Sequence, residues 1–384
     1  PAADGAFARL VHALRPGTGA RRAPAAAEIA AERRQAAPAG RDCRWARSAH
    51  GASLAEYSAD LRASFARRAP PSGWPCAPGT GGSSDSPGRG RGGTRAALLD
   101  WLVDVHAARH RLPETLFLAA SLIDRYVALR PPPLEKLQLA GIVALSLAAK
   151  FEEDGPLRME DMRELTDKAY TIDEFKSMEV GMLVTLDFRL CSTTAVHHLG
   201  IAHATDPCPE MQQCLAQYLL ELSLFDQALC ACAPSRLAAA AALLSSALVR
   251  RQPLELPMSK ESSRINMRIK GCARLMYACV KRAGQDDHHA VLRKFSQPAR
   301  LEVARLYSRD AVVRSSVLFE PAQGDRSENR SANRGARKRS LEEQGVDSEG
   351  SQRKHSAGTL SHACLQLALF SVASGGRAGA ARLR

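Results

Sequence analysis

Residues 94–106 read TRAALLDWLVDVH, an almost continuous apolar run that carries one Arg, two Asp and one Trp. Alanine and leucine favour helices, so the run predicts a helix that packs against a core. A helix buried on every face would have little use for Arg95 or Asp100, and a surface helix would not expose Leu98 and Trp101 together. We therefore expect one face to lie in a core and another to be polar, with Asp100 on the solvated side.

Four more helical patterns follow this run and complete a first group of five. Pro113 and Glu114 suit the start of the second helix, and Thr171 with Glu174 has the spacing of a capping box at the start of the fifth. The third pattern is apolar on nearly every face, so other helices must surround it. The patterns are LPETLFLAASLIDRYVAL (112–129), LEKLQLAGIVALSLAAKFEED (134–154), MEDMRELTDKAY (159–170) and TIDEFKSMEVGMLVTLDFRL (171–190).

A second group of helical patterns of similar length comes next. One of them, PSRLAAAAALLSSALVRR, is again apolar on nearly every face and should be central to its group. The group comprises residues 209–230, 234–251, 263–283, 288–296 and 298–307. The sequence therefore predicts an all-α protein with two tandem five-helix units, residues 94–193 and 194–309.

Composition separates the chain ends from these units. Residues 1–50 are rich in Ala, Arg and Pro without a sustained period, so we expect them to be disordered. Residues 51–93 combine one helix, carried by SLAEYSADLRASFARR, with a Gly/Ser/Pro-rich linker. Residues 310–384 turn Ser-, Arg- and Gly-rich, which predicts a disordered basic tail.

Charge and motifs restrict the function classes. The net charge of +13 is typical of nucleic-acid binding, but residues 94–206 carry 12 basic and 17 acidic residues. Ten cysteines form no CxxC pair and no zinc spacing, so we expect reduced thiols and no metal site. We find no phosphate-binding glycine loop and no nucleophile motif, and expect neither a cofactor nor catalysis. The longest apolar stretch, about 15 residues, is too short for a membrane span.

Taken together, the motifs resemble the cyclins, and within them the A/B mitotic group. The resemblance runs in register from about Glu56 to Tyr307 and is strongest in KFEE, TDKAYT and TLDF. It implies two cyclin folds, a preceding helix and a non-catalytic regulatory subunit of a cyclin-dependent protein kinase. Such a subunit would control cell-cycle progression at G2/M, with the kinase catalytic subunit as its partner.

The resemblance implies a kinase-binding face on the first unit. Lys150 and Glu179 match the two polar residues through which cyclins hold the kinase, and the fold would bring them together. Phe151, Glu152 and Leu183 would surround them. A kinase positions its phosphates only when its regulatory helix is correctly placed, so binding that helix would favour the active kinase.

The resemblance also implies an ion pair inside the first unit. Arg95 matches an arginine that pairs with an aspartate of the second helix, here Asp124. A charge in a helical core is tolerable only if it is paired, and breaking a buried pair costs about 3 to 5 kcal/mol. The alternative is two unrelated surface charges.

A peptide groove is implied on the helix of residues 94–106. In the family such a groove docks Arg-x-Leu peptides of substrates and inhibitors, and the matching residues here are Thr94, Ala97, Leu98, Trp101, Asp104 and Gln138. Leu98 and Trp101 would receive the leucine and Asp104 the arginine. Thr94 and Ala97 are less apolar than the family norm, which predicts docking weaker by about 1 to 2 kcal/mol. The alternative is that Leu98 and Trp101 are only core residues.

Short signals outside the two units add further hypotheses. Ser86, within SPGR, has the pattern of a cyclin-dependent kinase target, although such short matches also arise by chance. GARKRSLEE (335–343) is a basic cluster that predicts a nuclear and cytoplasmic location, or else a solvated charge run. The Arg-x-x-Leu destruction signal of mitotic cyclins is absent from residues 1–93.

Two other functions fit parts of the pattern. Some transcription factors use paired cyclin folds, and residues 207–309 carry 15 basic and 8 acidic residues. These basic residues do not form one stripe with aromatic residues, so we expect no direct nucleic-acid partner. A cyclin-like scaffold that binds no kinase is the third possibility, because the groove residues diverge from the family.

Overall fold

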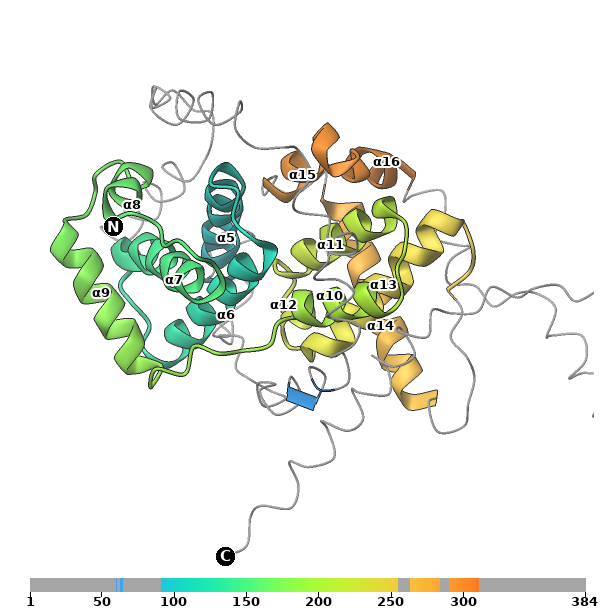
Figure 1. Ribbon diagram of the computed structural model, residues 1–384, viewed down its shortest axis with the longest axis horizontal. Coiled ribbons are helices and arrows are strands. Elements are labelled where there is room, and N and C mark those ends of the chain that lie inside the picture. Colours follow the sequence, from blue (N-terminus) through green and yellow to red (C-terminus); the bar gives the residue numbers. More distant parts are fainter. Residues whose placement is uncertain (1–59, 61–62, 65–90, 255–262, 284–289, 311–384) are drawn as a thin grey trace, which may run out of the picture.

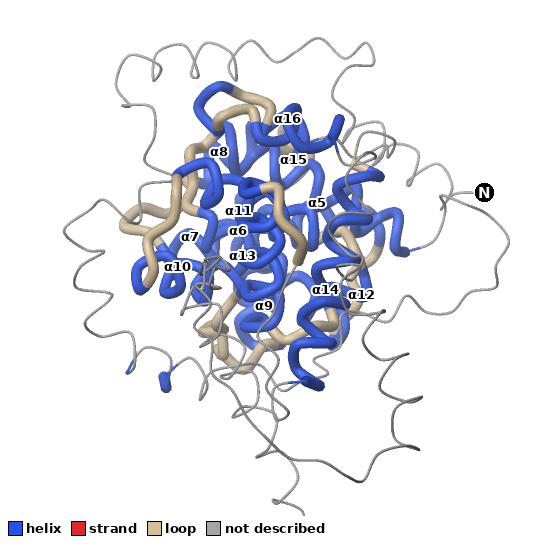
Figure 2. Tube along the Cα trace, turned by 90° about the vertical axis from the view of Figure 1, so that its right-hand side faces the viewer, coloured by secondary structure: helices blue, strands red, loops and turns tan. Residues whose placement is uncertain are grey.

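The computed structural model describes residues 60, 63–64, 91–254, 263–283 and 290–310. Every regular element in these ranges is a helix, and Figure 2 shows no strand among them. The helices form two units that lie side by side (Figure 1). The predicted all-α architecture with tandem units is thereby confirmed. Ser86, the disorder predicted for residues 1–50, most of the helix and linker predicted within residues 51–93, and nearly all of the tail predicted for residues 310–384 lie outside the described residues.

The first unit contains five α-helices, as predicted. They are α5 (Arg91–Ala108), α6 (Pro113–Leu129), α7 (Leu137–Glu152), α8 (Met159–Leu165) and α9 (Ile172–Thr185), with a short 3-10 helix, η1 (Leu134–Lys136), before α7. The predicted capping box is present, because Thr171 Oγ1 accepts from Glu174 N at 3.3 Å and Glu174 accepts from Thr171 N at 2.8 Å. Helix α5 begins before Thr94, so its first turn was missed.

Helix α7 lies at the centre of the first unit, where α5, α6 and α9 pack against it. Its residues from Gln138 to Ala149 are all buried. Gly141 lets α5 come close, because a Cβ at that position would lie 2.8 Å from Leu98 Cδ1. The prediction that other helices surround this segment is confirmed, and Leu98 is a core residue of the α5–α7 contact.

The second unit has α13 at its centre, packed against α10, α11 and α14. Its elements are α10 (Ala195–Thr205), α11 (Glu210–Ser223), α12 (Gln227–Cys230), α13 (Pro234–Arg250), α14 (Ser263–Arg282), α15 (Ala290–Phe295), η2 (Pro298–Arg300) and α16 (Val303–Asp310). The five sequence patterns cover α11 together with α12, then α13, α14, α15 and α16, and they missed α10, so the described part of this unit has seven α-helices and not the predicted five. Helix α10 buries His198 and His203, whose polar side chains interrupt its apolar pattern.

The two units share a continuous interior. Val103 of α5, with Leu116 and Phe117 of α6, belongs to the same buried cluster as the core of the second unit. The prediction that Asp100 lies on the solvated side of the helix is wrong, because Asp100 is only 6% exposed. Its carboxylate accepts a hydrogen bond of 2.8 Å from the backbone N–H of Ala290, the first residue of α15. Asp100 therefore caps a helix of the other unit.

A buried polar network also crosses this junction. Lys294 of α15 donates to Glu221 Oε1 of α11 at 2.6 Å, and its Nζ lies 3.5 Å from His106 Nδ1 of α5. His106 Nε2 lies 2.8 Å from the carbonyl oxygen of Leu112. Because a carbonyl oxygen can only accept a hydrogen bond, Nε2 carries the proton and donates it to this oxygen. Burial, and next the nearby charge of Lys294, hold the pKa of His106 well below its usual range, so the ring is neutral.

Candidate partner-binding surfaces

Lys150 and Glu179 meet on the surface of the first unit. Lys150 lies in the last turn of α7, and Glu179 lies in the middle of α9, which packs along α7. Lys150 Nζ donates to Glu179 Oε1 at 2.6 Å, with the lysine side chain exposed and the glutamate side chain half-buried. In this chain the two residues therefore bind each other and remain accessible to a partner.

Large apolar side chains that are close to these two residues in α7 and α9 are exposed to solvent. Phe151 is 48% exposed, and Val180 and Val184, one turn apart on α9, are 60% and 62% exposed. The sequence analysis missed both valines, because an apolar spacing of four normally marks a buried helix face. We call Lys150, Phe151, Glu179, Val180 and Val184 the α7–α9 surface. Exposed apolar side chains that lie together on a surface are typical of a site that binds a partner.

Two other residues predicted for the kinase-binding face lie differently. Leu183 is half-buried and packs against the core of the first unit. Glu152 turns toward α10, where its carboxylate lies 3.6 Å from His197 Nε2. Glu152 therefore lies at the contact between the two units.

Arg95 lies between the two units. It forms two hydrogen bonds with Asp124 of α6, from Nε to Oδ1 at 2.6 Å and from Nη2 to Oδ2 at 2.8 Å. Its Nη1 also donates to the carbonyl oxygen of Leu224 at 2.6 Å, just after α11. This bidentate geometry is the strong form of an Arg–carboxylate pair. Both side chains are largely buried, so the alternative of unrelated surface charges does not describe them.

The predicted groove residues are brought close by α5 and α7, but most of them are covered. Thr94, Leu98 and Gln138 are buried, whereas Ala97 and Trp101 are half-buried. Leu98 fills the space beside Gly141, so it has little surface left for a peptide. The accessible part of this region consists of Ala97, Trp101 and the neighbouring Asp104.

Asp104 is already paired within the chain. Arg293 Nη2 of α15 donates to Asp104 Oδ2 at 2.6 Å, and both side chains are partly exposed. Burial raises the pKa of the Asp104 carboxyl, while the charge of Arg293 acts in the opposite direction. Sequence spacing could not reveal this pair, because the partners lie 189 residues apart.

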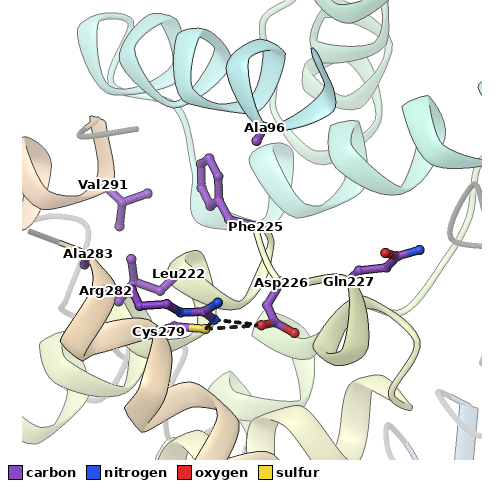
Figure 3. Close-up of a pocket in the computed structure, with 9 residues that line it drawn as sticks. All are labelled: Ala96, Leu222, Phe225, Asp226, Gln227, Cys279, Arg282, Ala283 and Val291. Atoms are coloured by element: carbon purple, nitrogen blue, oxygen red, sulfur yellow. Dashed lines mark hydrogen bonds and ion pairs between the residues drawn. The ribbon is translucent and has the colours of Figure 1, made fainter. Parts of the chain in front are cut away.

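A cavity of about 260 Å³ lies where the two units meet (Figure 3). Phe225 points toward α5, and the ion pair between Arg282 and Asp226, 3.0 Å long, lies at the opposite side. The cavity is lined by Ala96, Leu222, Phe225, Asp226, Gln227, Cys279, Arg282, Ala283 and Val291. Its contacts hold α14 to the segment that follows α11.

The described residues offer surfaces for partners. In this part of the chain no group of three His, Cys, Asp or Glu side chains is placed to hold a metal ion. Among the same residues, no helix is long and apolar enough to cross a membrane. The exposed α7–α9 surface is suited to binding a macromolecule through two charged anchors and apolar contact.

Comparison with known proteins assigns both units. A family model described as the N-terminal domain of cyclins matches residues 85–191, and one described as the C-terminal domain of cyclins matches residues 188–309. The two matches are consecutive and together cover more than half of the chain. They correspond to the first and the second helical unit.

Several relatives named as G2/mitotic-specific cyclins match part of the chain. The G2/mitotic-specific cyclin-B of Marthasterias glacialis is 40% identical over 155 residues, which are 40% of each chain. The G2/mitotic-specific cyclin-B2 of Homo sapiens is 41% identical over 154 residues, 40% of this chain and 39% of that protein. The cyclin-B2 of Oryzias javanicus is 34% identical over 232 residues, 59% and 61% of the two chains. The chain therefore spans about two fifths to three fifths of the length of these relatives.

Proposed function

Because this chain belongs to the cyclin family, we propose that it is a regulatory subunit of a cyclin-dependent serine/threonine protein kinase that acts in the G2/mitotic part of the cell cycle. It would have no catalytic step of its own. The relatives named G2/mitotic-specific cyclins support the cell-cycle assignment. The basic cluster at residues 335–343 supports a location in nucleus and cytoplasm.

The α7–α9 surface is the observation that carries this proposal. It combines the Lys150–Glu179 ion pair, in which Nζ and Oε1 are 2.6 Å apart, with three apolar side chains that are about half exposed or more. A kinase regulatory helix would bring its own polar groups to Lys150 and Glu179 and cover Phe151, Val180 and Val184. This binding would favour the active state only if that state offers the better contact, which is the condition for allosteric activation.

Co-purification and a phosphorylation assay test the proposal. The full chain, mixed with a cyclin-dependent kinase that is inactive alone, should elute with it and stimulate phosphorylation of a histone substrate. DNA cellulose run at increasing salt serves as the comparison, because a nucleic-acid-binding protein would be retained there and released by salt. Retention on DNA without kinase binding would contradict the proposal, and so would kinase binding without stimulation. Binding to neither the kinase nor DNA would favour the scaffold that binds no kinase.

Docking of Arg-x-Leu peptides near Trp101 belongs to the same proposal, and Arg293 should compete with the peptide arginine for Asp104. A peptide arginine must displace Arg293 from Asp104, so Arg293→Ala should raise peptide affinity about two- to fivefold, as expected for a partly exposed ion pair. Fluorescence anisotropy with a labelled Arg-x-Leu peptide measures the change. Arg305→Ala is the matched control, because Arg305 pairs with Glu302 in the same exposed manner. Equal affinities for Arg293→Ala and the unchanged chain would contradict this prediction.

A further inference from the structure

Two cysteine side chains face each other in the second unit. Cys232 lies in the short link between α12 and α13, and Cys272 lies in the middle of α14. Their Sγ atoms are 3.5 Å apart, in thiol–thiol hydrogen-bond contact. A disulfide bond is about 2.05 Å long, so a movement of about 1.5 Å would join them. The link is short and not part of a helix, so it can supply this movement more readily than α14.

The two thiols differ in a way that assigns them different roles. Cys232 is half-buried, and the hydrogen bond from Cys272, with the nearby charge of Arg236, lowers the pKa of its thiol. Cys272 is buried, and its contact with Cys232 together with burial raises the pKa of its thiol. An accessible thiolate beside a second thiol is the arrangement found in cysteines that react with oxidants.

We propose that Cys232 and Cys272 form a redox-active pair, in which a peroxide oxidises Cys232 and Cys272 then closes a disulfide. The Cys232 thiolate attacks one peroxide oxygen, the O–O bond breaks, and a sulfenic acid and one water molecule result. The Cys272 sulfur loses its proton and attacks the Cys232 sulfur, so that the S–S bond forms while the S–O bond breaks and a second water leaves. Two thiols lose two electrons in total, and hydrogen peroxide is reduced to two waters.

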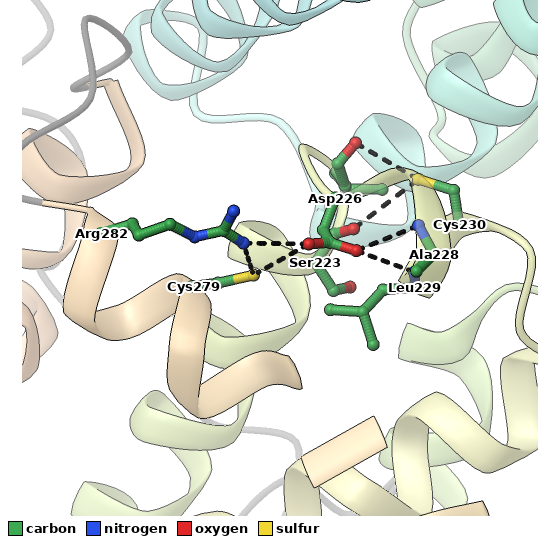
Figure 4. Close-up of polar contacts among 8 residues, drawn as sticks. Ser223, Asp226, Ala228, Leu229, Cys230, Cys279 and Arg282 are labelled. Atoms are coloured by element: carbon green, nitrogen blue, oxygen red, sulfur yellow. Dashed lines mark hydrogen bonds and ion pairs between the residues drawn. The ribbon is translucent and has the colours of Figure 1, made fainter. Parts of the chain in front are cut away.

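The disulfide would act on the contact between the units. Asp226 caps α12 by accepting from the backbone N–H of Ala228 and Leu229 at 3.0 and 3.1 Å, and Arg282 of α14 binds Asp226 (Figure 4). Helix α14 thus holds the start of α12, and the disulfide would hold the residues after its end. The Sγ of Cys230, the last residue of α12, lies 3.6 Å from Nη2 of Arg95 in the first unit. Oxidation should therefore stiffen the segment against which Arg95 is anchored.

Peptide mapping of the full chain tests the pair directly. The reduced protein is treated with a small excess of hydrogen peroxide, its remaining thiols are blocked with N-ethylmaleimide, and the digest is analysed by mass spectrometry. We expect one cross-linked peptide joining Cys232 to Cys272, which dithiothreitol releases, and a melting temperature raised by about 5 °C or more. Both cysteines recovered in alkylated form, or a cross-link of Cys232 to another cysteine, would overturn the proposal.

Single substitutions test the order of the two steps. In Cys272→Ser the reaction should stop at the sulfenic acid, so dimedone should label Cys232. In Cys232→Ser dimedone should leave Cys272 unlabelled, because its thiol is buried and protonated. The exposed Cys191 provides the control. If dimedone labels Cys191 ahead of Cys232, exposure alone decides the reaction and the proposal is wrong. Melting curves before oxidation verify that each variant is folded.

Discussion

Replacing Lys150 and Glu179 together with alanine should abolish kinase binding and leave the helical fold unchanged. Each side chain would be an anchor within apolar contacts that exclude water, the setting in which truncation costs about 2 kcal/mol or more. The double variant should therefore lose at least about a hundredfold in kinase affinity. The Lys150–Glu179 pair is partly exposed to solvent, and surface pairs contribute about 1 kcal/mol or less to stability. Titration calorimetry with the kinase and circular dichroism measure the two effects.

The chain offers a matched control for this experiment. Lys136 and Glu174 form another exposed ion pair, which joins η1 to the start of α9 at a distance from the exposed valines. The variant Lys136→Ala with Glu174→Gln removes a similar pair and keeps a side chain that can complete the capping box. It should bind the kinase as the unchanged chain does. If both double variants bind equally well, the α7–α9 surface is not the kinase-binding site.

The helices were predictable where the signals are local. Pro113 begins α6, and the Thr171–Glu174 capping box begins α9, because such caps act within four residues of the chain. The central position of α7 followed from a segment that is apolar on nearly every face. Helix α10 was missed because its buried His198 and His203 look polar in the sequence, although their environment keeps them neutral by lowering the pKa of each to about 4.

The contacts of polar residues on α5 were not predictable in the same way. Asp100 binds the N–H of Ala290, and Asp104 binds Arg293, at sequence separations of 190 and 189 residues. A local sequence pattern cannot predict such a contact, because the two partners come together only when the chain folds. Arg95 was assigned to Asp124 through the family resemblance, and its second contact, with the carbonyl oxygen of Leu224, had no sequence signal.

The α7–α9 surface shows a different limit. Val180 and Val184 have the spacing of a core-facing stripe, and a helix normally buries such a stripe. In α9 the core side is instead provided by Phe175 and Met182, which are fully buried. A sequence pattern reports that a residue is apolar, and it cannot distinguish burial in the core from burial under a partner.

Lys294→Met should destabilise the protein by about 3 to 5 kcal/mol, the usual cost of breaking a buried ion pair by removing one partner. Lys294 is 5% exposed and Glu221 is fully buried, so the substitution leaves a buried carboxylate without its cation. Urea unfolding of the variant and of the unchanged chain measures the difference in the free energy of unfolding.

The reciprocal and the combined substitutions separate the charge effect from simple loss of packing. Glu221→Gln removes the carboxylate that accepts from Lys294 and leaves a buried cation beside His106, so it should destabilise the protein by a similar amount. Glu221→Leu combined with Lys294→Met removes both charges, and the double variant should recover most of the lost stability. If the double variant is as unstable as the sum of the single ones, the two residues do not act as a pair. Recovery would show that the junction accepts both charges or neither, and that its stability comes from the apolar interior shared by the two units.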